Sequence, residues 1–236
     1  MHYIIAVGFG MFDRVSKTFH WSWQLMLRAL SPWACAYCKT FLKQQDVFCS
    51  SCFVKLKPVV SYMLPITTTR SVKIFAACAY QEPIKTLIVA KSWSDHCASK
   101  QLGQLIWQMT DIKNAPCDYI IPIPLHWTRY AKRGFNQAHE IGKFLSSKNN
   151  APVADILKRV KRTPFQSQIP FKMRLENVQD AFELKNIDAE LYKGKHLMIV
   201  DDLMTTGSTI KTAAKILFQL KPASICVVVA SRVVPN

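Results

Sequence analysis

Two adjacent carboxylates in the C-terminal third of the chain precede a turn rich in hydroxyl groups. Asp201 and Asp202 follow an apolar run, and the next residues combine one glycine with four hydroxyl side chains: Thr205, Thr206, Gly207, Ser208 and Thr209. Paired carboxylates accept hydrogen bonds from two ribose hydroxyls, whereas hydroxyl groups donate to phosphate oxygens. Glycine lets the backbone approach a ligand closely. The pattern therefore predicts a site for a phosphorylated sugar.

The sequence on either side of this turn predicts the elements that would hold it. Residues 197–200 are uniformly apolar, as in a buried parallel strand. After the turn, apolar residues recur at helical spacing: Ile210, Ala213, Ala214, Leu217 and Leu220. The start of such a helix presents free N–H groups and the positive end of its dipole to an anion. The alternative is that the acids and hydroxyls only cap the helix.

A second stretch rich in cations follows another predicted strand. Residues 118–125 are apolar and end in prolines, so we expect a strand there and a loop over 126–137. The loop contains Arg129, Lys132, Arg133, Gly134, Phe135, Asn136 and Gln137. Loops beyond the carboxyl ends of parallel strands form the ligand crevice. We therefore expect this loop and the Asp201 turn to face one cleft, with Arg129 and Arg133 against a pyrophosphate. The alternative is a solvated basic loop whose Phe135 packs into the core.

The same cations and their neighbours are also candidates for contacts with nucleic acid. Residues 158–162 place four positive charges in five positions, and a polar stretch follows that we expect to act as a mobile lid. Arginine keeps its charge at any physiological pH, which suits such a lid. The candidate nucleic-acid residues are Lys132, Arg133, Phe135, Asn136, Gln137, Arg162 and Arg174.

Four cysteines near the N-terminus have the spacing of a metal site. Two Cys-x-x-Cys pairs, Cys35 with Cys38 and Cys49 with Cys52, are separated by ten residues. Four thiolates would complete a closed tetrahedron around structural Zn²⁺, and metal binding would stabilise this short module. Two disulfides, a redox dithiol or an iron site are the alternatives. Lysines and aromatic residues surround the cysteines, and they either bind single-stranded nucleic acid or serve only packing and solvation.

Composition narrows the classes of partner and of enzyme. The 236 residues carry a net charge of +16, which favours an anionic partner such as a polyphosphate, nucleic acid or anionic membrane. Neither a P-loop nor a zinc-protease motif is encoded. The longest apolar N-terminal run, residues 3–12, is too short to span a bilayer and lacks a basic leader. We therefore expect a cytoplasmic protein, with peripheral attachment at the inner face of the membrane left open.

The periodicities predict an α/β fold with a mostly parallel sheet flanked by helices. Strands are expected over 72–80, 118–125, 153–157, 197–200 and 225–230, and helices over 83–93, 101–109 and 138–145. The predicted organisation is an amphipathic helical segment over 1–34, the four-cysteine module over 35–57 and the α/β domain over 58–236.

The Asp201 turn resembles the phosphoribosyl-pyrophosphate loop of the type I phosphoribosyltransferases, in which four apolar residues and two acids precede a Thr-Gly-x-Thr turn. Further motifs extend the resemblance. In chain order they are the four-cysteine knuckle, Ile121-Pro122-Ile123-Pro124-Leu125, Arg133-Gly134-Phe135-Asn136-Gln137, Thr163 with Gln166, Arg174-x-x-Asn177 and Val200-Asp201-Asp202. This order is similar to that of the ComF family, which includes competence proteins and GntX-like relatives and joins a zinc module to a phosphoribosyltransferase-like domain.

The resemblance implies a protein that handles single-stranded DNA entering the cell during natural transformation, together with a DNA translocase or helicase or a recombination mediator. It also implies that phosphoribosyl pyrophosphate binds at the turn with Mg²⁺. Three hypotheses stay open at this point. The chain handles DNA with little or no turnover, or it is a working phosphoribosyltransferase in which Asp201 and Asp202 act on an oxocarbenium-like transition state, or it is a structural adaptor. Thr205 stands where 6-oxopurine salvage enzymes carry a third acid, which disfavours that substrate class.

Overall fold

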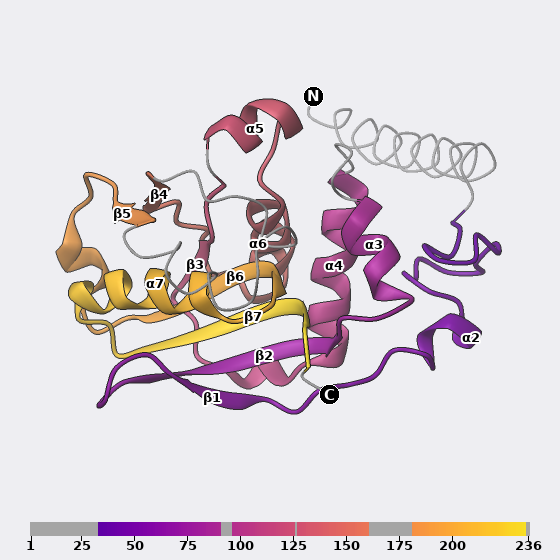
Figure 1. The fold of residues 1–236 in the computed structure, drawn as a ribbon, viewed down its shortest axis with the longest axis horizontal. Helices are drawn as coiled ribbons and strands as arrows, with labels where there is room; N and C mark the ends of the chain where they lie inside the picture. Colours follow the sequence, from indigo (N-terminus) through magenta and orange to yellow (C-terminus); the bar gives the residue numbers. More distant parts are fainter. Residues whose placement is uncertain (1–32, 91–95, 126, 161–180, 235–236) are drawn as a thin grey trace, which may run out of the picture.

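The computed structural model describes residues 33–90, 96–125, 127–160 and 181–234. Its centre is a five-stranded sheet with the order β1-β2-β7-β6-β3 (Figure 1). The strands are β1 (Tyr62–Pro65), β2 (Ser71–Ala79), β3 (Tyr119–Pro122), β6 (His196–Met204) and β7 (Ser224–Arg232). β2, β7, β6 and β3 run parallel, and β1 is antiparallel to β2 at one edge. The predicted mostly parallel sheet is confirmed.

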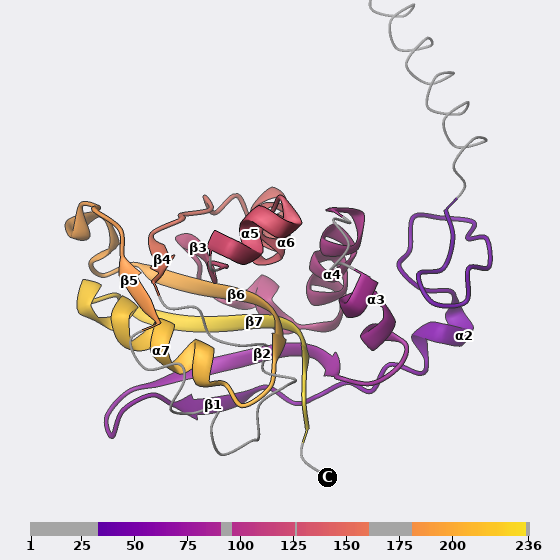
Figure 2. The same cartoon turned by 45° about the horizontal axis from the view of Figure 1, so that its top comes forward.

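The central strands are apolar because both faces of the sheet are covered. Residues 197–200 of β6 are completely buried, as the sequence predicts for a parallel strand. Helix α7 (Ser208–Leu217) covers one face through Ile210, Ala213 and Leu217. On the other face, α4 (His96–Met109) and α6 (Gln137–Asn149) pack side by side, and α3 (Ile84–Ala90) lies against α4 (Figures 1 and 2). The sheet therefore lies between two helical layers.

Short elements complete the described chain. They are α2 (Ser50–Phe53), α5 (Trp127–Arg133), the strands β4 (Leu157–Arg159) and β5 (Phe182–Leu184), and the 3-10 turns η2 (Asp111–Asn114), η6 (Ala189–Tyr192) and η7 (Phe218–Leu220). β4 and β5 pair with each other as a separate two-stranded sheet.

Three sequence expectations need correction. The segment expected as a loop over 126–137 contains helix α5, because no glycine or proline interrupts residues 127–133 and Gly134 ends the helix with a positive φ of 78°. The strand expected over 153–157 is displaced, because Val153 forms only an isolated bridge with Ile120 and the paired strand is β4. Strand β6 does not stop before the two acids but pairs with β7 as far as Met204.

Some predicted features lie outside the described residues. The N-terminal segment is described only at residues 33 and 34, and the predicted lid, including Arg162 and Arg174, falls within 161–180. In the part of the chain that is described, every helix is too short or too polar to cross a membrane.

Candidate functional site

The two carboxylates leave β6 near its carboxyl end, in the interior of the sheet. Asp201 lies opposite Val229 of β7, and Asp201 and Asp202 are both partly exposed, unlike the four residues before them. The backbone N–H of Asp202 donates a 2.8 Å hydrogen bond to Oδ1 of Asp201. Near its carboxyl end, β6 thus carries two acids that are partly exposed and positioned by the sheet pairing.

A left-handed glycine shapes the turn between β6 and α7. Gly207 has a φ of 76°, a conformation that side chains with a Cβ rarely adopt. It is buried beside Leu64 of β1, whose Cδ2 would lie 3.4 Å from a Cβ built on the glycine. The hydroxyls of Thr206 and Ser208 lie 3.0 Å apart, one on each side of the glycine. Thr205, Thr206 and Thr209 are partly exposed, whereas Ser208 is buried.

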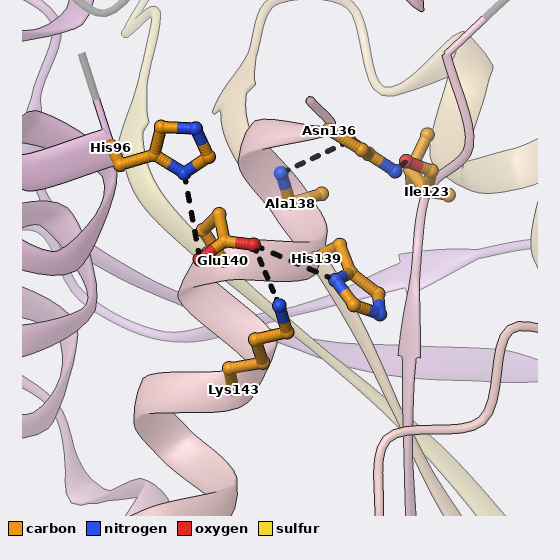
Figure 3. Close-up of polar contacts among 7 residues, drawn as sticks. All are labelled: His96, Ile123, Asn136, Ala138, His139, Glu140 and Lys143. Carbon is orange, nitrogen blue, oxygen red and sulfur yellow. Dashed lines mark hydrogen bonds and ion pairs between the residues drawn. The ribbon is translucent and has the colours of Figure 1, made fainter. Parts of the chain in front are cut away.

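The end of β3 is hydrogen-bonded both to β6 and to the segment that follows α5. The N–H of Ile123 donates to the carbonyl oxygen of Val200 over 2.9 Å, and Nδ2 of Asn136 donates to the carbonyl oxygen of Ile123 over 3.0 Å. Oδ1 of Asn136 also accepts from the N–H of Ala138 and caps α6 (Figure 3). Because Val200 directly precedes Asp201, this path brings the Arg133–Gln137 segment to the strand end that carries the acids.

The structure gives the candidate nucleic-acid residues of this segment different environments. Arg129, Lys132 and Arg133 belong to α5. Phe135 is only 4% exposed and its ring stacks on His96 with centroids 3.9 Å apart. Gln137 is 1% exposed, and within the described part of the chain no acceptor lies within reach of its Nε2. Phe135 and Gln137 therefore anchor the segment from within.

An acid–base cluster that sequence inspection missed lies next to this segment. Oε1 of Glu140 is 3.0 Å from Nζ of Lys143 and 3.8 Å from Nδ1 of His139, and its Oε2 is 3.9 Å from Nδ1 of His96 (Figure 3). Burial alone would raise the pKa of Glu140, but the hydrogen bond and charge of Lys143, with the two histidines, lower it. The i, i+3 spacing of Glu140 and Lys143 was the available signal, whereas the approach of His96 from α4 is visible only in the fold.

The four cysteines of the N-terminal module converge, as their spacing predicts. The Sγ atoms of Cys35, Cys38, Cys49 and Cys52 all lie within 4.8 Å of one another. Those of Cys38 and Cys49 are 3.6 Å apart, close to the separation of roughly 3.8 Å that a tetrahedron with 2.3 Å metal–sulfur bonds requires. All four are free thiols rather than disulfides. The cluster has the donor set and the size for one metal ion.

The environments of the thiols differ within this cluster. Hydrogen bonds from Thr40, with further ones from Cys35 and Cys49, lower the pKa of Cys38 to about 6. Burial raises the pKa of Cys52 to about 12. Burial also opposes ionisation of Cys35, but N–H donors from Cys49, Cys38 and Tyr37 lower its pKa. The site thus combines thiols that ionise readily with one that a bound cation would have to deprotonate.

The cysteine module packs against the α/β domain instead of standing apart. Val47, Phe48 and Leu56 share a buried cluster with Leu102 and Leu105 of α4. Nε2 of Gln104 donates to the carbonyl oxygen of Gln45 over 3.0 Å. The lysines around the cysteines are all exposed: Lys39, Lys43, Lys55 and Lys57. Phe48 packs inward, whereas Phe41 is 74% exposed, so the surface of the module is both basic and partly aromatic.

Comparison with known proteins identifies relatives of this chain by sequence. The model of the phosphoribosyl transferase domain family matches residues 132–233. Competence protein F of Haemophilus influenzae is 30% identical over 193 residues, which are 79% of each chain. Competence protein ComFC of Bacillus subtilis is 27% identical over 210 residues, covering 78% of this chain and 83% of the relative.

Similarity extends to a DNA utilization protein and to an enzyme of known structure. DNA utilization protein YhgH of Salmonella typhimurium is 26% identical over 218 residues, which are 84% of this chain and 89% of the relative. Adenine phosphoribosyltransferase from Thermoanaerobacter pseudethanolicus is similar over 75% of this chain and 84% of its own, with 14% identity and a TM-score of 0.37. On the sequence match to competence protein F, the chain belongs to the competence protein F (ComF) family and carries a phosphoribosyltransferase-type domain.

Proposed function

We propose that this chain handles single-stranded DNA in natural transformation and binds phosphoribosyl pyrophosphate, or a related phosphosugar with Mg²⁺, at the Asp201 turn. The observation that carries the proposal is the path from Asn136 through Ile123 to Val200, which joins a cationic segment to the end of a strand bearing two acids. Names of relatives that refer to competence and DNA utilization support the DNA part.

The phosphosugar part rests on the chemistry of the turn. Asp201 and Asp202 offer carboxylate oxygens to ribose hydroxyls, and Thr205, Thr206 and Thr209 offer partly exposed hydroxyls to a phosphate. Helix α7 begins directly after Gly207, so its first N–H groups face the same turn. Mg²⁺ would neutralise the pyrophosphate, with Arg129 and Arg133 as further cations.

The DNA part rests on charge. The chain has 31 lysines and arginines against 15 acids, and no acid occurs between Asp118 and Glu140, the interval that contains α5. Such a segment attracts a phosphate backbone irrespective of base sequence. Arg162 and Arg174 are further candidate contacts to DNA, and only the sequence supports them because they lie outside the described residues. Zn²⁺ at the four cysteines would stabilise the module that packs on α4.

A salt titration tests the DNA part. Binding through several phosphates makes the logarithm of the affinity fall linearly and steeply with the logarithm of salt concentration, whereas binding of one small ligand falls gently. We expect the steep dependence for a single-stranded oligonucleotide, and a shallower one after Arg129, Lys132 and Arg133 are all changed to Gln. An unchanged slope in this variant would contradict α5 as the DNA surface and would point to the lysines of the cysteine module.

The second candidate function is catalysis of phosphoribosyl transfer. It is favoured because both acids and the turn hydroxyls occur together from the carboxyl-terminal part of β6 to the start of α7. In that reaction the bond from the ribose anomeric carbon to pyrophosphate breaks, pyrophosphate leaves with the electron pair, and a base nitrogen forms the new bond and releases its proton. Asp201 and Asp202 would stabilise the cationic sugar. Incubation with phosphoribosyl pyrophosphate, Mg²⁺ and a panel of bases tests this. Pyrophosphate release that depends on one base would establish turnover, and none with any base would exclude it for that panel.

A further inference from the structure

Helix α5 exposes two aromatic rings at the surface of the described chain. Trp127 is 72% exposed and Tyr130 is 53% exposed. They lie three residues apart on a helix, so their Cβ atoms are neighbours on one side of it, about 5–6 Å apart. In Figure 1 the helix lies at the margin of the fold, beyond the layers that enclose the core. Two large rings thus face solvent together.

The segment that follows the helix has anchors of its own. Phe135 and Gln137, which follow the helix, are buried and already anchor it, and Phe135 stacks on His96. Asn136 ties the same segment to Ile123. Exposed tryptophan and tyrosine pairs are typical of binding surfaces, because each ring offers a large contact area at a low cost in conformational entropy.

The surroundings of the pair favour an anionic partner with flat, apolar faces. The seven residues of α5 include three cations and no acid, and none of the residues from 119 to 139 is acidic. A lipid surface would also attract cations and aromatic rings, but interfacial binding grows with the apolar area buried. A helix of this length, about 10 Å, offers little beyond the two rings. Unpaired bases on a phosphate backbone match both features at once.

We infer that Trp127 and Tyr130 form a stacking platform for the bases of single-stranded DNA, whose phosphates the cations of α5 attract. This inference rests on the proposed function. It identifies Trp127 and Tyr130 as the residues that make the protein prefer unpaired bases. Bases in a duplex stack on one another and are unavailable, so the platform selects single strands. Since α5 connects β3 to the Asn136 segment, the bound strand would lie at the same edge of the sheet as the Asp201 turn.

The test compares two ligands with the same phosphates, of which only one has bases. Fluorescence anisotropy measures the binding of the full chain to labelled oligothymidylate and to an abasic oligomer of equal length. We expect the wild type to prefer oligothymidylate. W127A/Y130A should lose this preference through a loss of about tenfold or more in affinity for oligothymidylate, with its affinity for the abasic oligomer and its salt slope unchanged. W127F/Y130F should retain most of the preference, because phenyl rings still stack.

The controls separate stacking from unfolding and from a general loss of apolar surface. L191A removes another exposed apolar side chain, from η6, and should bind both oligomers like the wild type. Photocrosslinking of the wild type to DNA that contains 5-iododeoxyuridine should modify Trp127 or Tyr130, and this measurement does not require a variant to fold.

Each contrary outcome identifies what fails. If the wild type binds single-stranded DNA but W127A/Y130A keeps the preference for bases, or crosslinks map elsewhere, the platform is wrong while the proposed function stands. If the wild type binds neither oligomer, the proposed DNA function itself is wrong. If W127A/Y130A binds both oligomers like the wild type and loses only the binding of anionic phospholipid vesicles, the rings contact a membrane rather than bases. That outcome overturns the inference.

Discussion

The side-chain amide of Asn136 donates a 3.0 Å hydrogen bond to the carbonyl oxygen of Ile123 while its Oδ1 caps helix α6. One side chain therefore fixes the start of a helix and ties it to the end of a sheet strand. Ile123 in turn donates its N–H to Val200, the residue before Asp201. The position of the cationic segment relative to the acids depends on this residue.

Two substitutions at Asn136 separate its two hydrogen bonds. N136D keeps an acceptor for Ala138 but removes the donor to Ile123, whereas N136A removes both. We expect N136A to lower the free energy of unfolding by about 1–2 kcal/mol. N136D should lower it by about 1 kcal/mol and still weaken ligand binding. Urea unfolding and oligonucleotide binding measure the two effects. D188A, which removes another cap at η6, is the control. If N136D binds the oligonucleotide as tightly as the wild type, the hydrogen bond to Ile123 does not contribute to ligand binding.

Gly207 and Gly194 form a matched pair of left-handed glycines. Their φ values are 76° and 69°, but Gly207 lies in the Asp201 turn beside Leu64, whereas nothing lies within 4 Å of a Cβ at Gly194. Alanine at either position should cost about 1–2 kcal/mol of stability from backbone strain. Only G207A should also weaken the binding of phosphoribosyl pyrophosphate. Thermal denaturation and calorimetry measure both effects, and equal binding by the two variants would contradict a role for the turn.

Removal of one thiol from the cysteine cluster should release its metal. C49S leaves three sulfur ligands, so we expect zinc content to fall from about one ion per chain towards none and residues 35–57 to become sensitive to protease. C97S changes an exposed cysteine of α4 outside the cluster and serves as the control. Metal analysis and limited proteolysis measure the outcome. Full zinc content and normal stability in C49S would show that the cluster is not a structural metal site.

The Glu140 cluster predicts a pH-dependent contribution to stability. Its lowered pKa means that the folded state binds fewer protons than the unfolded state as pH falls through the acidic range. The contribution is therefore present above the ordinary glutamate pKa of about 4.3 and is lost as pH falls through the lowered value. E140Q should cost about 0.5–1 kcal/mol at neutral pH and nothing in strong acid. E190Q, at the exposed pair with Lys193, is the control. A pH-independent loss in E140Q would refute the electrostatic account.

The sequence was sufficient to predict those elements whose residue pattern depends directly on burial or on ligand spacing. Residues 197–200 predict a buried parallel strand because a strand covered on both faces needs no polar side, and all four are buried. The cysteine spacing likewise predicts the convergence of four Sγ atoms. The positive φ of Gly207 agrees with the expected turn between strand and helix.

The sequence was insufficient where contacts between distant elements decide the outcome. The sequence predicts a loop where α5 forms, because a run of seven mostly charged and aromatic residues is too short for helical periodicity to be recognised. Phe135 is buried, and its ring stacks on His96, about forty residues earlier in the chain. The continuation of β6 through both acids depends on its pairing with β7 as far as Met204. Such pairings follow from the assembled sheet rather than from local preference.

Calorimetric titration of phosphoribosyl pyrophosphate with Mg²⁺ tests the central claim most directly. The wild type should bind one molecule per chain at the Asp201 turn. D201N/D202N should lose the binding by a factor of ten or more with an unchanged thermal midpoint, because ribose hydroxyls lose their charged acceptors. D155N, at an exposed carboxylate paired with Lys185, should bind normally. Absence of binding by the wild type, or unchanged affinity in D201N/D202N, would contradict the account.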